Sequence, residues 1–369
     1  MADALDIAIL DAQAKKRAAV VLARYGSDIA IAELPAGKEL KALLDFKDRI
    51  SQVLLLSQKR PTKKELTEFG HALFAYIVRE NVERLYNRLP VNTLIRFHIL
   101  ANRPDLQSLP WEYLQDPQQG AGPWPNRSIV RVIPTIGYTP PAPLQLAQLA
   151  ATGTKLRILF VYAVPQDQNL VSWPSVKSSI EKAFSLRIPA SHYELKVIQG
   201  TTEELFAAFH NNNDKYEIFQ FSGHGDVDPQ TNEGRILLVN SKKNDQSLPM
   251  SASQLASILQ SRGVRLAVLS ACLTSAGNSA DPFNVVAEAL LASGIPAVVA
   301  NHLPVPDASV ATFVGALYTQ LLNTGDIDIA VNEGRLKMAI ELAVPQDATL
   351  EWGIPTLYRY INGAQVFQP

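Results

Sequence analysis

The second half of the chain alternates between short apolar runs and amphipathic segments, and this alternation limits the folds it can adopt. Five apolar runs bounded by turn residues are predicted to be strands: 156–164, 193–198, 216–221, 265–270 and 297–301. The segments between them carry apolar residues three or four positions apart, which is typical of helices that cover a sheet. The pattern therefore predicts an α/β fold in which a mostly parallel sheet is flanked by helices.

The first part of the chain mixes strands and helices in a less regular order. Strands are predicted at 5–10, 18–25 and 94–100, and a helix is predicted over 65–85. Between 116 and 143 the chain is rich in proline, which indicates a boundary. We therefore predict an N-terminal α+β subdomain over 1–140, a linker over 141–154, and a catalytic domain over 155–369.

Composition excludes several classes of function. With 34 Lys and Arg against 35 Asp and Glu, no net positive field favours nucleic acid, so we expect no direct nucleic-acid contact. No apolar run approaches the ~18 residues that span a bilayer, and the acidic N-terminus is unlike a signal peptide. The single cysteine allows neither an internal disulfide nor a thiolate-rich zinc site. We expect a cytoplasmic protein that uses no metal or organic cofactor.

Two reactive side chains come directly after neighbouring predicted strands. His224 lies between two glycines after the strand 216–221, and Cys272 follows the strand 265–270. Residues beyond the carboxyl ends of adjacent parallel strands share one crevice. A thiol that attacks an acyl group needs a base and oxyanion donors. We therefore predict His224 as the base, with the backbone amides of Gly225 and Cys272 as the donors. The plainer alternative is that Cys272 is a small buried apolar residue.

The motifs around these residues resemble a known family. S-G-H-G at 222–225 and L-S-A-C at 269–272 are similar to the paired motifs of the CHAT-domain proteins, bacterial relatives of caspases and separase. L-P-W-E at 109–112 and the aromatic-Gly-x-Pro segment at 352–355 extend the resemblance over most of the chain. It implies a caspase-like cysteine endopeptidase with His224 and Cys272 as its dyad. The chain departs from many relatives at Ser275, where they carry glycine.

Acidic residues in the predicted loops are candidates for a substrate pocket. They are Asp167, Asp226, Asp228, Asp281 and Asp307. An unpaired carboxylate at the pocket floor would select arginine or lysine before the cut, and we favour this over an apolar floor that selects leucine or methionine. The last two acids also occupy positions where helix N-caps are expected.

Two other functions fit the same residues. One is a catalytically silent, caspase-like module that holds a protein partner in its cleft. The other is a thiol-dependent amidase or transferase. For the peptidase, we expect a protein or peptide substrate and a regulatory protein that acts in trans, with residues 1–140 as its docking surface.

Overall fold

A computed structural model describes most of the chain. The described residues are 4–11, 19–56, 59–90, 93–100, 103–118, 122–123, 126–132, 139–210, 215–231, 233–260, 262–273, 282–301, 305, 307–343, 349–360 and 362–369. At 54–56, 150, 271–273, 282–284 and 307 only the backbone is described.

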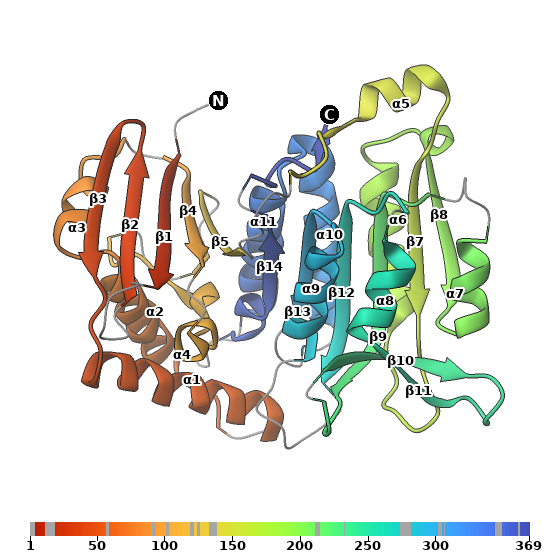
Figure 1. Cartoon of the computed structure of the whole chain (residues 1–369), viewed down its shortest axis with the longest axis horizontal. Helices are drawn as coiled ribbons and strands as arrows, with labels where there is room; N and C mark the ends of the chain where they lie inside the picture. The colour runs from red at the N-terminus through yellow and green to blue at the C-terminus, as the bar shows by residue number, and fades with distance from the viewer. Residues whose placement is uncertain are drawn as a thin grey trace.

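Thirteen strands of the described chain form one mixed sheet that runs the length of the molecule (Figure 1). Its order is β11-β10-β9-β12-β13-β14-β5-β4-β1-β2-β3, and β7 and β8 extend it beside β9. The strands are β1 Leu5–Asp11, β2 Ala19–Tyr25, β3 Asp28–Glu33, β4 Ile95–Ile99, β5 Arg127–Val132, β7 Leu156–Tyr162, β8 Tyr193–Gln199, β9 Ile218–Val227, β10 Gly234–Asn240, β11 Gln246–Ser251, β12 Leu266–Leu273, β13 Ala297–Asn301 and β14 Pro355–Arg359. Two short strands pair separately, β6 Leu144–Gln145 and β15 Phe367–Gln368. Most pairs in the large sheet are parallel, so the predicted α/β architecture is confirmed.

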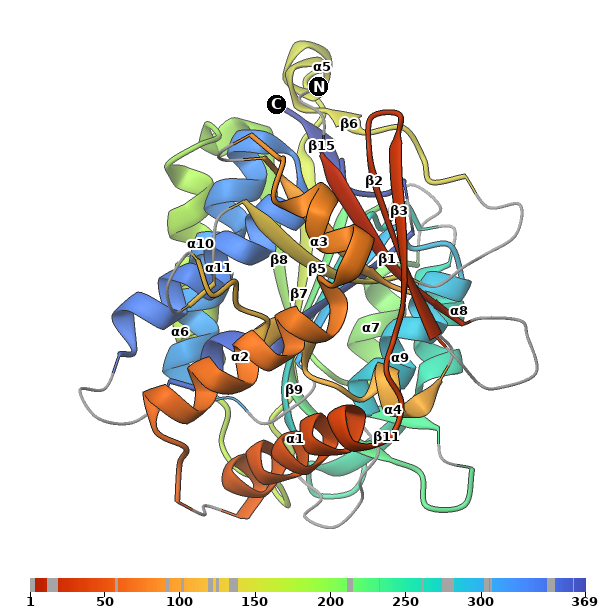
Figure 2. The same ribbon diagram turned by 90° about the vertical axis from the view of Figure 1, so that its left-hand side faces the viewer.

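Helices cover both faces of the sheet in the C-terminal half. Figure 2 shows α6, α10 and α11 on one side of the sheet and α7, α8 and α9 on the other. The helices are α1 Lys38–Leu56, α2 Lys63–Ile77, α3 Glu80–Tyr86, α4 Pro104–Gln107, α5 Leu146–Thr152, α6 Trp173–Ser185, α7 Thr202–Ala208, α8 Ala252–Leu259, α9 Pro282–Ala292, α10 Asp307–Thr324 and α11 Ile327–Glu341. Alternate residues of β7 enter different cores, Phe160 on the α10 side and Val161 on the α8 side. This explains why its sequence is almost continuously apolar.

The N-terminal strands belong to the same sheet as the C-terminal ones. The predicted strands at 5–10, 18–25 and 94–100 are confirmed as β1, β2 and β4, whereas β3 and β14 were not predicted. The predicted helix over 65–85 is divided into α2 and α3, because Glu80 has a positive φ of 52°. β5 pairs in parallel with β14, which joins the two halves of the chain. The division at 141–154 stays a prediction.

Two of the family-like segments pack against each other at this junction. The Tyr113 hydroxyl donates a hydrogen bond to the Leu350 carbonyl at 2.6 Å, and the edge of the Tyr113 ring meets Trp352. A Cβ at Gly353 would lie 2.2 Å from a Tyr113 ring carbon, so no larger residue fits there. Glu112 pairs with Arg131 of β5 at 3.1 Å. The segments 109–112 and 352–355 therefore join the halves of the molecule.

Buried charges cross the same junction. Arg359 of β14 binds both carboxylate oxygens of Asp328 at 2.6 Å, and Arg96 of β4 reaches the same carboxylate at 3.1 Å. Both Asp328 and Arg359 are almost completely buried. Burial alone would raise the pKa of the Asp328 carboxyl, but Arg359 and Arg96 hold that pKa below its ordinary value. This ion pair explains why a strand that carries an arginine lies inside the sheet.

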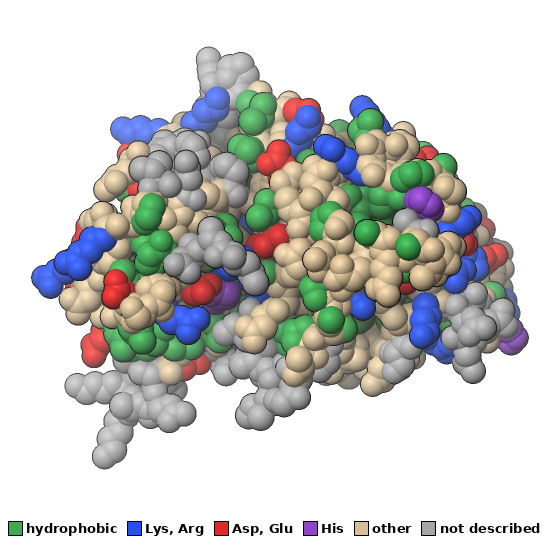
Figure 3. Space-filling view, turned by 90° about the horizontal axis from the view of Figure 1, so that it is seen from above, with side chains coloured by type: hydrophobic (Ala, Val, Ile, Leu, Met, Phe, Trp, Pro, Cys, Tyr) green, Lys and Arg blue, Asp and Glu red, His purple; other side chains and the backbone are tan. Residues whose placement is uncertain are grey.

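The surface shows no single charged field on the face in Figure 3, where basic side chains lie scattered among acidic and apolar ones. Within the described residues, no helix is both long and apolar enough to cross a membrane. The same part of the chain contains no group of three or more His, Cys, Asp or Glu side chains arranged to hold a metal ion.

Replacing Asp328 by asparagine should lower the free energy of unfolding by about 3–5 kcal/mol, because the buried guanidinium of Arg359 loses its counter-charge. The folded-state pKa of Asp328 lies below the ordinary value of about 3.9, so its contribution is present above that pH and is lost as the pH falls through the folded pKa. Urea denaturation across this range should therefore show a steeper acid loss for the wild type than for Asp328→Asn. The control is Asp48→Asn, an exposed acid paired only with Lys47. Equal losses for the two variants would contradict the assignment.

Candidate active site

His224 and Cys272 lie directly opposite each other in the parallel ladder between β9 and β12. Neighbouring strands in a sheet are about 4.8 Å apart, so the two backbones are in contact at this point. Both residues lie inside their strands, because β9 continues to Val227 and β12 to Leu273. The expectation that they follow the strand ends is therefore wrong, but the expectation that the topology brings the two positions together is confirmed at the level of the backbone.

β9 continues beyond its apolar run because it pairs first with β7 and then with β10. Residues 218–222 of β9 pair with β7, and residues 224–227 pair with β10. Gly223 lies at the changeover, where a Cβ would come within 2.7 Å of the Phe221 ring and 3.0 Å of the Ala163 carbonyl oxygen. The first glycine of the S-G-H-G motif is thus required by close packing beneath the loop that follows β7.

A buried polar network fixes the register of this ladder. The Gln220 amide donates to the Ser270 hydroxyl at 3.0 Å and accepts from the Tyr318 hydroxyl of α10 at 2.9 Å. All three residues are buried. A slip of one residue would carry these groups to the opposite face and leave them without partners. The serine of the L-S-A-C motif therefore helps to hold position 272 opposite His224.

The orientation of the His224 ring follows from one hydrogen bond. Its Nε2 lies 2.7 Å from the backbone carbonyl oxygen of Asn169. A carbonyl only accepts, so Nε2 carries the proton and Nδ1 of the neutral ring has a free lone pair. Within the described residues, neither Nδ1 nor the nearby Ser222 hydroxyl has a hydrogen-bond partner, although both are buried. Other buried polar atoms of the described residues also have no partner, Nδ1 of His98 among them, so it is the position opposite Cys272 that distinguishes His224.

Asn169 belongs to a loop, residues 163–172, that is fastened to the β10–β11 hairpin. Asp167 accepts hydrogen bonds from the Ser247 amide at 2.8 Å and from its hydroxyl at 2.7 Å. The Gln166 amide donates to the Asp245 carbonyl at 2.8 Å. Asp167 was predicted as a candidate pocket residue, and a role in substrate selection stays a prediction, but its carboxylate is already bound by Ser247. These contacts hold the loop whose carbonyl orients His224.

Asp226 and Asp228 are also occupied by protein contacts. Arg235 of β10 lies opposite Asp226 in the ladder, binds both of its carboxylate oxygens at 2.7 Å, and reaches Asp228 at the same distance. The amides of Gln230 and Thr231, together with Arg235, hold the pKa of Asp228 below its usual value. Neither acid is the unpaired carboxylate that was predicted, because the hairpin supplies its own arginine.

The remaining predicted site groups are described in part or not at all. Gly225 lies inside β9, in register with Ile236 and Leu273, so the expectation of an open loop at this glycine is wrong. Asp281 and Ser275 lie outside the described residues, as do the side chains of Cys272 and Asp307. α9 begins at Pro282, as its sequence predicted.

Two residues of the site were not found from the sequence. Asn169 acts through a backbone carbonyl, which any residue type supplies, so its identity gives no signal. Arg235 was assigned only to a surface hairpin, and the spacing of Asp226 and Asp228 on one strand face was the available indication that a cation lies opposite them.

Comparison with known proteins gives one family. The sequence model of the CHAT domain matches residues 67–360. No curated protein matches the chain.

Similar solved structures include a cysteine proteinase and a separase–securin complex. The Arg-specific cysteine proteinase gingipain R has a TM-score of 0.48 and 11% identity, over 83% of this chain and 75% of the gingipain chain. The Saccharomyces cerevisiae separase–securin complex has a TM-score of 0.47 and 13% identity, over 96% of this chain and 30% of that one. A complex of the pro- and mature domains of RgpB from Porphyromonas gingivalis has a TM-score of 0.47 and 12% identity, over 80% and 71% of the two chains.

The hydrogen bond to Asn169 predicts a single tautomer for His224. In isotope-labelled Cys272→Ala protein at mildly alkaline pH, side-chain NMR should show a protonated Nε2 and an unprotonated Nδ1. Removing the thiol ensures that it cannot transfer its proton to the ring. Exposed His210 serves as the internal control and should give tautomer-averaged signals. A proton found on Nδ1 of His224 would contradict the assignment of Nδ1 as the nitrogen that accepts the thiol proton.

Proposed function

Because the chain belongs to the CHAT-domain family, we propose that it is a cysteine endopeptidase with His224 and Cys272 as its dyad. One observation carries the proposal: the backbone register sets Cys272 opposite a histidine whose Nδ1 has no hydrogen-bond partner among the described residues and can accept a proton. Positions in register on parallel strands share a face of the sheet, so positions 224 and 272 lie on the same side. A base beside the only cysteine of the chain is the arrangement that nucleophilic thiol catalysis requires.

The reaction would proceed in two transfers. The Cys272 sulfur attacks the scissile carbonyl carbon, and its proton passes to Nδ1 of His224. The imidazolium is stabilised by the Nε2 hydrogen bond to the Asn169 carbonyl, which grows stronger when the ring is charged. Nδ1 then returns the proton to the leaving amine, and water, activated by the same nitrogen, hydrolyses the thioester. The assignment of the Gly225 and Cys272 amides as oxyanion donors stays a prediction from the sequence, because Gly225 lies inside β9, between β10 and β12.

We propose that fewer acids than the sequence indicated select the substrate residue that precedes the cleaved bond. Asp226 and Asp228 share the single guanidinium of Arg235, and the Asp167 carboxylate is hydrogen-bonded to Ser247. Of the acids predicted for a pocket that selects arginine or lysine, Asp281 and Asp307 remain candidates. A peptide library that varies this position reads the preference directly, and leucine or methionine there would indicate an apolar floor.

Alanine substitution of either dyad residue should reduce cleavage of a peptide library by roughly a thousandfold or more, and the double variant should lose no more than either single one. The losses do not add because the base acts only through the thiol. The control is His210→Ala, which removes an exposed histidine and should leave cleavage unchanged. Cleavage that survives Cys272→Ala would place the chemistry elsewhere. Reaction with small amides or acyl acceptors, but not with peptides, would favour the amidase or transferase.

We also propose that a protein partner controls access to the dyad, and residues 1–140 are its candidate docking surface. His224 is only 2% exposed, so a peptide cannot reach the ring until the residues that cover it move. The same burial is the observation that favours the catalytically silent module as the second candidate.

The purified chain should therefore cleave protein substrates slowly, and addition of its partner should raise the rate without changing the site of the cut. The rate of substrate cleavage is measured for the purified chain and for the chain in extract. The Cys272→Ala form, measured in both conditions, gives the cleavage that does not depend on this cysteine. Full activity of the isolated wild-type chain would contradict the proposed control. Failure of a small electrophile to label Cys272 at neutral pH, together with the absence of any cleavage in extract, would favour the silent module.

A further inference from the structure

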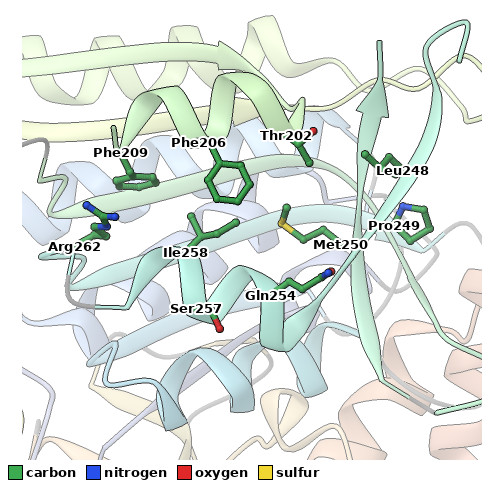
Figure 4. Close-up of a pocket in the computed structure, with 10 residues that line it drawn as sticks. All are labelled: Thr202, Phe206, Phe209, Leu248, Pro249, Met250, Gln254, Ser257, Ile258 and Arg262. Carbon is green, nitrogen blue, oxygen red and sulfur yellow. The ribbon is translucent and has the colours of Figure 1, made fainter. Parts of the chain in front are cut away.

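An apolar groove of about 530 Å³ lies on the face of the sheet opposite the His224 side. Its walls come from α7 and α8, and the end of the groove is formed by β11 (Figure 4). The lining residues are Thr202, Phe206, Phe209, Leu248, Pro249, Met250, Gln254, Ser257, Ile258 and Arg262. Figure 4 shows Phe206 of α7 facing Ile258 of α8 and Met250 across the groove. Phe206 is 61% exposed, which is unusual for a large aromatic residue on a helix.

The groove has a charge at one end only. Arg262 is the single charged residue among its lining residues, and its guanidinium lies over the Phe209 ring, 5.8 Å from the ring centre. Within the described residues, no acid forms an ion pair with Arg262. The aliphatic part of Lys215 packs beside Gly263, the residue that follows Arg262. A ligand that fills this groove would therefore gain from a carboxylate placed at Arg262.

We propose that this groove binds an amphipathic helix of a partner protein, with apolar side chains along one face and an acidic residue at the Arg262 end. α7 and α8 are seven and eight residues long, so the groove between them matches about two turns of a third helix. Apolar residues at positions i, i+4 and i+7 or i+8 would contact Phe206, Ile258 and Met250. This binding surface is independent of the proposed peptidase chemistry, because it lies on the other face of the sheet.

Two other occupants fit the groove less well. An extended peptide would have to pair with β11, which pairs only with β10 among the described strands, but Pro249 lacks the N–H group that such pairing needs. A small apolar acid would remain largely in water, because the groove is open along the exposed Phe206 side chain. A helix covers the opening and the walls together.

The test uses a display library of random peptides of about 14 residues, long enough for roughly four helical turns. Selection is made on the full Cys272→Ala chain, so that bound peptides are not cleaved, and affinities are measured by fluorescence anisotropy. Selected peptides should share the apolar i, i+4, i+7 or i+8 pattern with one acid near an end. Phe206→Ala should weaken their binding about tenfold or more, as expected for a central aromatic contact. Leu186→Ala, which removes an exposed leucine beside α6 on the opposite face, is the matched control and should leave binding unchanged.

A charge exchange tests the Arg262 contact. Arg262→Glu should weaken binding of the acidic peptide about tenfold, and replacing the peptide acid by lysine should restore it against this variant alone. The proposal is overturned if the selected peptides bind to the Phe206→Ala and Arg262→Glu variants as tightly as they bind to the chain with an unchanged groove. It is also overturned if they lack the apolar and acidic pattern, or if sodium dodecanoate displaces them, since that would assign the groove to a fatty carboxylate. None of these results depends on peptide cleavage.

Discussion

The register of the parallel ladder between β9 and β12 determines whether the two reactive residues can meet. In a β-sheet a shift of one residue carries every side chain of a strand to the other face, so a histidine and a cysteine on neighbouring strands cooperate only in one register. Here the Gln220 amide donates to the Ser270 hydroxyl and accepts from the Tyr318 hydroxyl, and these two hydrogen bonds disfavour any slip. The mechanism proposed for His224 depends on this constraint, because the register places position 272 opposite it.

The loop and the hairpin around His224 form a second layer of control. The Asn169 carbonyl directs the ring, Asp167 binds the loop to Ser247, and Arg235 joins the end of β9 to β10. Three of the acids proposed for a substrate pocket, Asp167, Asp226 and Asp228, therefore also hold the loop and the hairpin in place. The family-like segments at 109–112 and 352–355 likewise act at a distance, since they pack at the junction of the two halves.

The sequence predicted the features that depend on local pattern and missed those that depend on pairing. The apolar runs of β7, β9 and β12 were found because strands buried on both faces must be continuously apolar. The ends of β9 and β12 were placed too early, because their polar and small residues are held in the sheet by β10 and by each other. β14 was missed for a related reason: Arg359 lies in a buried strand only because Asp328 neutralises it from α11. Arg235, which pairs with Asp226, and the Asn169 carbonyl, which orients His224, come from other segments of the chain. A pattern in the sequence around Asp226 or His224 therefore cannot predict these contacts.

The central claim is that His224 activates the thiol of Cys272. The chain has one cysteine, so the rate of alkylation by iodoacetamide reports on that thiol alone. This rate, measured as a function of pH in the wild type and in His224→Ala, is the most direct test. We expect the wild-type thiol to react at neutral pH. In His224→Ala, the pH at which the alkylation rate rises should shift towards the pKa of an ordinary thiol, about 8.5. Identical pH profiles for the two proteins would contradict it.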